Sequence, residues 1–184
     1  MSKEKKQNPK KYSSKGSPKK TTKKSEPKKK SAPKAPKTPL KIISLGGLGE
    51  IGKNLTVYEY KNDILLVDCG MAFPDEETPG VDIVIPDFSY LVLNREKIRG
   101  LVVTHGHEDH IGAIPYLLDN INVPIYATQL TIGLIEGKLK EHKNLASAKL
   151  NVVTPGQTLQ FGEFSVEFIH VNHSIADACA FAIK

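Results

Sequence analysis

The residues most able to do chemistry are concentrated in one hexapeptide, His-Gly-His-Glu-Asp-His at positions 105–110, directly after a short apolar run. An apolar strand that feeds a tight turn can aim several side chains at one point. His105 and His107, two residues apart, can face the same side of such a backbone, while Asp109 and His110 project onto a neighbouring position. Imidazole nitrogens with a carboxylate oxygen suit zinc, and manganese is the alternative where carboxylate and water complete the shell.

Packing is the alternative explanation for so many polar residues. The chain has six histidines in all, and three of them lie within this hexapeptide. Burying that many titratable groups without a cation carries a heavy desolvation cost, so the pattern predicts a metal site. Two subsites a few ångströms apart would make a two-metal hydrolase, in which a bridging hydroxide attacks and both cations stabilise the developing charge.

Two other positions extend the predicted site. Asp68 ends the apolar run 64–67, where it would hold a ligand imidazole or a water; the alternative is a turn-capping role before Gly70. A third nitrogen ligand from another strand would complete one tetrahedral subsite. His173, past the end of the last predicted strand, is the better candidate, and His170 is expected in the core.

The charge is divided unevenly along the chain. Residues 1–39 hold fifteen lysines against two glutamates, a net charge of +13, whereas residues 40–184 have a net charge of −7. The first segment has few apolar side chains, so we expect a disordered tail. Such a tail can condense onto RNA phosphates, or it can be a solubilising extension without a defined target.

The two cysteines, Cys69 and Cys179, both lie in apolar runs and do not form a disulfide framework, so a reducing cytoplasm is expected. Each is interpreted as a small buried hydrophobe. No run of eighteen apolar residues occurs, so we expect no membrane span.

Residues 47–52 match G-x-G-x-x-G, the pattern of dinucleotide-binding loops. That function requires a helix directly afterwards, whereas an alternating strand is predicted here, so we reject it. The remaining interpretation is a loop that needs positive φ or a close backbone approach.

The elements that must position these residues are mainly strands, with helices between them. Periodicity predicts strands over 41–45, 55–60, 64–67, 100–104, 123–127, 150–154, 158–161 and 164–170, and helices over 111–120 and 128–142. In the second helix the spacing places Leu130, Leu134, Ile135 and Leu139 on one side. Such a pattern suits a sandwich of the α+β class, in which helices cover sheets.

The His-x-His-x-Asp-His motif, with Asp68 on an earlier strand and His173 after a later one, resembles the metallo-β-lactamase superfamily. The flanking sequence narrows the resemblance to the ribonuclease J family of the β-CASP group. The segments that carry it are 46–54, 67–74, 80–87, 110–118, 134–139 and 172–175, and it covers about residues 40–184.

The resemblance implies an αββα metallo-β-lactamase sandwich, of which residues 40–184 would form the first half. It implies 5′-to-3′ exonuclease and endonuclease activity on single-stranded RNA in the cytoplasm, by a homodimer or homotetramer, in RNA processing and decay.

The resemblance also implies two Zn²⁺ ions per site, or Mn²⁺. His105, His107 and His173 would hold one cation, and Asp109 and His110 would contribute to the other. Asp68 would support the site, and Asp109, His110 and Asp68 are the expected catalytic residues.

The sequence ends at Lys184, before the family motif that supplies a bridging aspartate and before the β-CASP domain. We therefore expect an amino-terminal portion with about half of a catalytic site, and doubtful activity by itself. Two rival functions remain: a glyoxalase-like thioesterase, against which segment 71–87 argues, and a non-catalytic RNA-binding fragment that uses the basic tail.

Overall fold

A computed structural model describes residues 38–74, 76, 79–143 and 145–184. The predicted disordered tail, residues 1–39, lies outside the described residues except for its last two positions. The expected start of the folded part near residue 40 stays a prediction, although the first strand does begin at Lys41.

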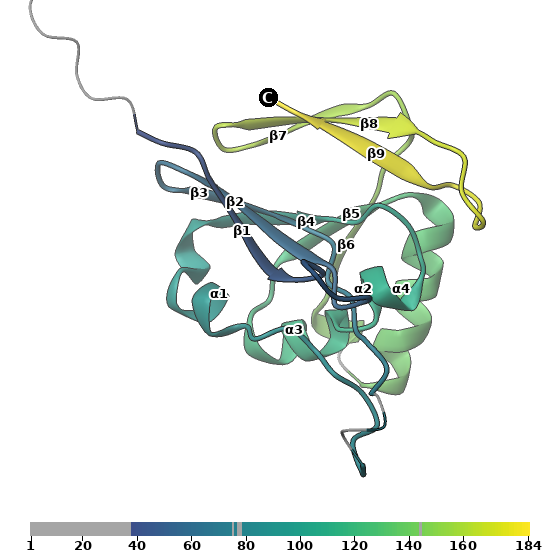
Figure 1. The fold of residues 1–184 in the computed structure, drawn as a ribbon. Helices are drawn as coiled ribbons and strands as arrows, with labels where there is room; N and C mark the ends of the chain where they lie inside the picture. The colour runs from purple at the N-terminus through teal and green to yellow at the C-terminus, as the bar shows by residue number, and fades with distance from the viewer. Residues whose placement is uncertain (1–37, 75, 77–78, 144) are drawn as a thin grey trace, which may run out of the picture. The chain divides into compact units, whose positions relative to one another are not determined.

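The centre of the fold is a six-stranded sheet with its strands in sequence order (Figure 1). Its first three strands run antiparallel, and each of the last three runs parallel to its predecessor. The strands are β1 (Lys41–Gly46), β2 (Leu55–Tyr60), β3 (Asp63–Val67), β4 (Ile98–Val102), β5 (Pro124–Ala127) and β6 (Lys149–Val152).

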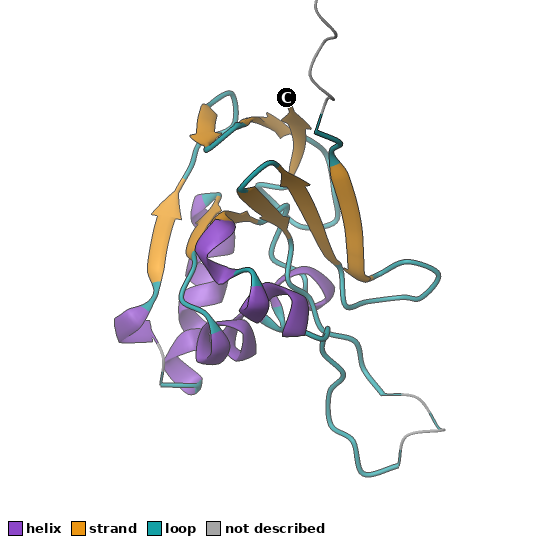
Figure 2. Ribbon diagram, turned by 90° about the vertical axis from the view of Figure 1, so that its left-hand side faces the viewer, coloured by secondary structure: helices purple, strands orange, loops and turns teal. Residues whose placement is uncertain are grey.

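Helices cover one face of this sheet (Figure 2). They are α1 (Ser89–Leu93), α2 (Glu108–Ile111), α3 (Ile114–Asn120) and α4 (Gln129–Glu141), with 3-10 turns at Arg95–Lys97 and Leu145–Ser147. Ile64 and Leu66 of β3 are fully buried against these helices. Between β3 and α1 the chain makes a long loop that extends away from both sheets (Figure 2).

A second, three-stranded antiparallel sheet packs on the other face, with β7 (Thr158–Phe161), β8 (Phe164–His170) and β9 (Cys179–Ile183). Leu65, between the two helix-facing residues of β3, points to this side and joins a core with Phe168 and Val166. The alternation follows from the two-residue period of a strand. The layers are therefore helices, large sheet and small sheet, which is the α+β sandwich that the sequence predicted.

Three predicted strands, 55–60, 158–161 and 164–170, have the predicted bounds. The predicted helix 111–120 is wrong in its bounds. The chain forms two short helices there, α2 and α3, which are separated around Gly112, and Pro115 lies in the first turn of α3. Helix α1 and strand β9 were not predicted.

The apolar side predicted for α4 coincides only partly with the side that is buried. Ile135 and Leu139 are fully buried, but Leu130 and Leu134 are exposed, and Thr131 and Ile132 are buried instead. Both stripes satisfy helical spacing, so the apolar pattern alone does not distinguish them. The expectation that His170 lies in the core is also wrong, since it is exposed at the end of β8.

Candidate metal centre

The candidate site lies at the carboxyl ends of the parallel strands. Asp68 directly follows β3, Thr104 and His105 follow β4, and Thr128 follows β5. Parallel strands bring their carboxyl ends to one edge of the sheet, where their side chains meet. The backbone continues this alignment, since Asp68 N donates to Val102 O at 3.0 Å and Val103 N donates to Tyr126 O at 3.0 Å.

Three imidazoles converge at this edge. Nε2 of His105 lies 3.1 Å from Nδ1 of His107 and 3.1 Å from Nε2 of His173. The three ligand atoms lie within 4.8 Å of one another. A tetrahedral zinc ion with Zn–N distances of about 2.0–2.1 Å separates its nitrogen ligands by about 3.3 Å, so this donor set fits such an ion.

His105 is the innermost member of this group, 7% exposed, whereas His107 is half-buried and His173 is exposed. Burial, reinforced by the neighbouring imidazoles, lowers the pKa of His105 to about 4. The ring is therefore neutral at physiological pH, as a metal ligand must be. Its Nδ1 lies 2.9 Å from Thr104 Oγ1, which leaves Nε2 facing the other two imidazoles.

His173 lies in the loop between β8 and β9. Hydrogen bonds hold the two ends of this loop in place. Val171 N donates to Ala178 O at 3.0 Å, and Cys179 N donates to Thr104 O at 2.8 Å. The hydroxyl of Thr128 donates to Asp177 O at 2.9 Å. These bonds tie the loop of the small sheet to the strand ends of the large sheet and bring His173 to His105.

Asp68 lies behind the imidazoles. It is buried and adopts a left-handed backbone conformation with φ of 59°, which Asp tolerates better than most residues. Its Oδ1 accepts from Thr104 N at 2.7 Å, and its Oδ2 lies 2.8 Å from Nδ1 of His110. Burial by itself lowers the pKa of His110, but the hydrogen bond and charge of Asp68 outweigh it, so the net pKa is raised.

Asp109 and His110 form a second group. Oδ2 of Asp109 lies 3.3 Å from Nε2 of His110, the nitrogen that does not face Asp68. The ring centroids of His105 and His110 are 4.1 Å apart, so the two groups are neighbours. The structure thus brings together all six predicted site residues: His105, His107 and His173 lie in one group, and Asp109 and His110 lie beside it with Asp68 behind them.

The backbone of this second group is hydrogen-bonded to the segment 69–71. Cys69 N donates to His110 O at 2.8 Å, and Met71 N donates to Glu108 O at 3.0 Å. The chain passes so closely that a Cβ on Gly70 would lie 1.6 Å from Asp109 O. Glycine is required at that position because backbone occupies the place of a side chain.

Sequence reasoning missed two residues of the site, Thr104 and Asn54. The Thr104 hydroxyl contacts Asp68 and both His105 and His110, and Asn54 contacts Asp109 and His110. Thr104 directly precedes the histidine motif, which was a usable signal. Asn54 is fifty-five positions from Asp109, and no spacing in the sequence relates them.

Two ionisable residues of the neighbouring helices lie outside the two groups. Glu108 forms an ion pair with Lys138 of α4 at 2.6 Å. His142 is the C-cap residue of α4, and the centroid of its ring lies 5.0 Å from that of Tyr116.

The glycine-rich loop after β1 has the predicted backbone. Gly47, Gly49 and Gly52 have φ of 81°, 76° and 90°, and strand β2 follows instead of a helix. The predicted strand after the loop is therefore confirmed, and the helix that a dinucleotide-binding loop requires does not follow it. Cys69 and Cys179 are buried and free, as predicted.

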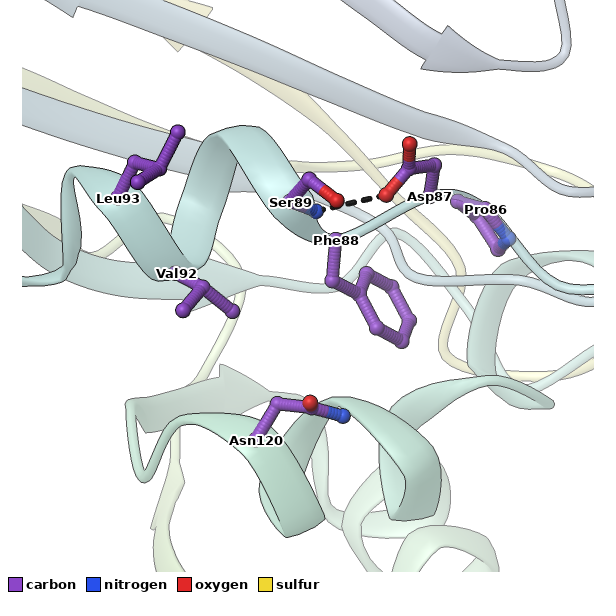
Figure 3. Close-up of a pocket in the computed structure, with 7 residues that line it drawn as sticks. All are labelled: Pro86, Asp87, Phe88, Ser89, Val92, Leu93 and Asn120. Carbon is purple, nitrogen blue, oxygen red and sulfur yellow. Dashed lines mark hydrogen bonds between the residues drawn. The ribbon is translucent and has the colours of Figure 1, made fainter.

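A hollow lies between α1 and α3, on the helical side of the large sheet and apart from the strand-end site (Figure 3). Asp87 is the one ionisable residue among the seven that line it, and its Oδ1 accepts from Ser89 N at 2.8 Å. This hollow lacks the grouped donors that distinguish the strand-end site. Among the described residues, no helix has the length and apolar character needed to cross a membrane.

The sequence profile of the metallo-beta-lactamase superfamily matches residues 48–178. The chain therefore belongs to that superfamily, and the predicted fold class is confirmed.

Within it, the chain is similar to proteins named ribonuclease J. It is 51% identical over 146 residues to Ribonuclease J of Synechocystis sp., covering 78% of this chain and 23% of that protein. It is 49% identical over 153 residues to Ribonuclease J of Corynebacterium glutamicum, covering 83% and 21%. The predicted resemblance is confirmed, and the chain spans about a quarter of the length of these relatives.

Two solved structures share the fold at lower identity. A protein of unknown function from Enterococcus faecalis V583 has a TM-score of 0.58 at 20% identity, over 79% of this chain and 40% of that one. The metallo-beta-lactamase fold protein YhfI from Bacillus subtilis has a TM-score of 0.52 at 20% identity, over 79% and 58%.

Proposed function

We propose that this chain supplies metal-binding residues of a ribonuclease J-type hydrolase that cleaves RNA phosphodiesters, by 5′-to-3′ exonuclease and endonuclease activity. The observation that carries the proposal is the convergence of His105, His107 and His173 within 4.8 Å, in a chain about 50% identical to proteins named ribonuclease J.

The residues have distinct proposed roles. His105, His107 and His173 hold one divalent cation, and Asp109 and His110 contribute to a second, with Asp68 fixing the His110 ring through Nδ1. A divalent cation bound there polarises the phosphodiester and stabilises the negative charge that develops on it. Zinc is the proposed ion, because three of the donors are imidazoles, and manganese is the alternative.

His105 and His110 are prepared differently for this task. His105 is kept neutral by burial, so its Nε2 lone pair is available well below pH 7. His110 is orientated by the Asp68 carboxylate, which accepts from Nδ1–H and makes Nε2 the ligand nitrogen. We propose Asp109, His110 and Asp68 as the catalytic group, because Asp109 and His110 would contribute to the second cation and Asp68 orientates the His110 ring.

An exposed aromatic residue supports an RNA substrate. Phe73, 73% exposed, lines a hollow that also includes Ile51 and Asp109. Exposed aromatic rings stack on nucleobases with little sequence preference. A base resting on Phe73 would lie beside the Asp109 side of the metal centre.

Cation binding is tested first. Zinc titration by calorimetry should show that His107→Ala lowers the affinity of the tightest site by at least tenfold, because one of three nitrogens is lost. His142→Ala is the matched control, since that imidazole lies outside the cluster. Equal zinc affinities in the His107→Ala variant and the unaltered chain would refute the assignment.

Because little activity is expected of this chain by itself, RNA cleavage is tested on 5′-labelled single-stranded RNA with zinc or manganese, using a full-length ribonuclease J that contains this chain. Cleavage should disappear in His107→Ala and with a chelator, and remain in His142→Ala. A thioester hydrolysed in place of RNA would favour the glyoxalase-like alternative. RNA bound but never cleaved, equally by His107→Ala, would favour a non-catalytic RNA-binding role.

Residues 1–39 are proposed to add RNA affinity without sequence preference. Each phosphate neutralised on a single strand contributes a slope of about −0.7 in log affinity against log salt. Deleting residues 1–39 should flatten that slope, and an unchanged slope would exclude the tail as a contact. A cytoplasmic location and a homodimeric or homotetrameric state are proposed from the family, and light scattering of the purified protein tests the latter.

A further inference from the structure

Asn54 lies where three segments of the second cation group meet. Its backbone N donates to Asp109 O at 3.1 Å, and its own carbonyl accepts from Gly70 N at 3.0 Å. Its carboxamide Nδ2 also donates to Asp109 O, at 3.0 Å. Asn54 is therefore anchored to the backbone that carries Asp109 before its side chain makes any further contact.

The same carboxamide nitrogen reaches both ligand atoms of the group. Nδ2 lies 3.2 Å from Oδ2 of Asp109 and 3.3 Å from Nε2 of His110. These two atoms are themselves 3.3 Å apart. The Asp109 side chain is 41% exposed, so a donor that selects one orientation of its carboxylate has an ordering effect.

A bound cation would leave most of this arrangement in place. A carboxylate oxygen has two lone pairs, so Asp109 Oδ2 can accept from Asn54 and still bind a cation. The imidazole Nε2 has one lone pair, so the cation replaces only the contact between Asn54 and His110. The carboxamide thus holds the carboxylate beside the imidazole both before and after a cation enters.

The other end of the carboxamide lies close to the glycine-rich loop. A Cβ added to Gly47 would lie 2.4 Å from Asn54 Oδ1, well inside contact distance. Gly49 has nearly the same positive φ, 76° against 81°, but a Cβ there would meet nothing within 4 Å. Absence of a side chain at Gly47, rather than loop flexibility in general, is what leaves room for Asn54.

We propose that the Asn54 carboxamide, seated against Gly47, is the positioning residue of the second cation subsite formed by Asp109 and His110. The inference rests on the proposed metal centre and assigns a function to the glycine-rich loop 47–52, which a strand follows.

The experiment is zinc calorimetry on the unaltered chain and on Asn54→Ala, Gly47→Ala and Gly49→Ala. Asn54→Ala should weaken the second, weaker zinc-binding event about 10–100-fold, the range seen when a supporting hydrogen bond to a ligand is removed. The tighter event, at the three imidazoles, should stay within about twofold. Gly47→Ala should reproduce this loss because its methyl group displaces the carboxamide.

Gly49→Ala is the matched control, since it places alanine in the same loop at the same kind of φ. Its backbone strain is comparable to that of Gly47→Ala, because the two glycines have nearly the same positive φ. Equal losses in the two alanine variants would overturn the inference, because strain alone would then explain them. A second zinc affinity unchanged by Asn54→Ala would also overturn it.

A measurement on the unaltered chain guards against variants that fail to fold. In ¹⁵N–¹H spectra the Asn54 carboxamide signals should shift with the second equivalent of zinc and stay in place with the first. Signals that never respond, or a chain that binds a single zinc ion, would refute the positioning role. If the unaltered chain bound no zinc at all, the proposed metal centre itself would be refuted, so the two failures are distinguishable.

Discussion

Glu59 is a buried carboxylate near the end of β2, and replacing it with glutamine should weaken the fold in a pH-dependent manner. The side chain is 5% exposed and accepts from Lys41 Nζ and Lys97 Nζ, each at 3.0 Å, and from the Tyr90 hydroxyl. These bonds connect three elements: β1, the 3-10 turn before β4, and α1. Removing the charge while keeping the shape isolates its electrostatic contribution.

The magnitude follows from the pKa of Glu59. The Tyr90 hydrogen bond, with those of the two lysines, lowers it from 4.5 to about 2, against the opposing effect of burial. A carboxyl pKa lowered from 4.5 to about 2 corresponds to about 3 kcal/mol at neutral pH. Because the Lys41 side chain is about half exposed and the amide oxygen of the Glu59→Gln variant can still accept from Tyr90, we expect about 2 kcal/mol.

The sign of the pH dependence is fixed by the lowered pKa. The unfolded carboxyl group takes up a proton near pH 4.5, whereas the folded one resists protonation until about pH 2. The stabilisation is therefore complete above about pH 4.5 and is lost as the pH falls toward 2. The difference in unfolding free energy between the native chain and Glu59→Gln should shrink across that window.

Urea denaturation at pH 7, 4 and 3 with a chelator present measures this difference. At pH 7 the loss of about 2 kcal/mol corresponds to a Tm lower by about 4–8 °C for a domain of this size. Glu96→Gln is the control, since that side chain is 93% exposed beside Arg95 and should change stability by less than about 0.5 kcal/mol. A Glu59→Gln difference as large at pH 3 as at pH 7 would refute the reasoning.

Three further predictions concern the hydrophobic core, the close backbone approach at Gly70 and the competition between protons and zinc for the histidines. Phe168→Ala, at a fully buried ring between the two sheets, should cost about 3–5 kcal/mol by urea denaturation; a cost below about 1 kcal/mol would mean that the sheets do not pack as described. Gly70→Ala should cost about 2–3 kcal/mol or more because its Cβ would collide with a carbonyl, whereas Gly137→Ala, open to solvent in α4, should gain about 0.5–1 kcal/mol; similar effects of the two would contradict the close approach. Because the pKa of His110 is raised and that of His105 is lowered to about 4, calorimetry between pH 8 and pH 6 should show the second zinc site weakening first; parallel weakening of both sites would count against the assigned protonation states.

Local patterns in the sequence determined much of this protein. The alternation in 55–60 and 164–170 defined two strands, because a half-buried strand exposes every second residue. The order of strands and helices predicted the α+β sandwich. The hexapeptide 105–110 indicated the site, because burying so many imidazoles and a carboxylate together without a cation carries a heavy desolvation cost.

The tertiary structure alone decided which side chains meet. Apolar spacing in α4 allowed two stripes, and packing against the sheet selected the one with Thr131 and Ile132 while Leu130 remained exposed. His173 reaches His105 across sixty-eight positions because hydrogen bonds from the loop join the two sheets. Asn54 reaches Asp109 because Gly47 and Gly70 leave space for the chain to pass. Such contacts depend on how distant segments are brought together, and no local period of the sequence records that.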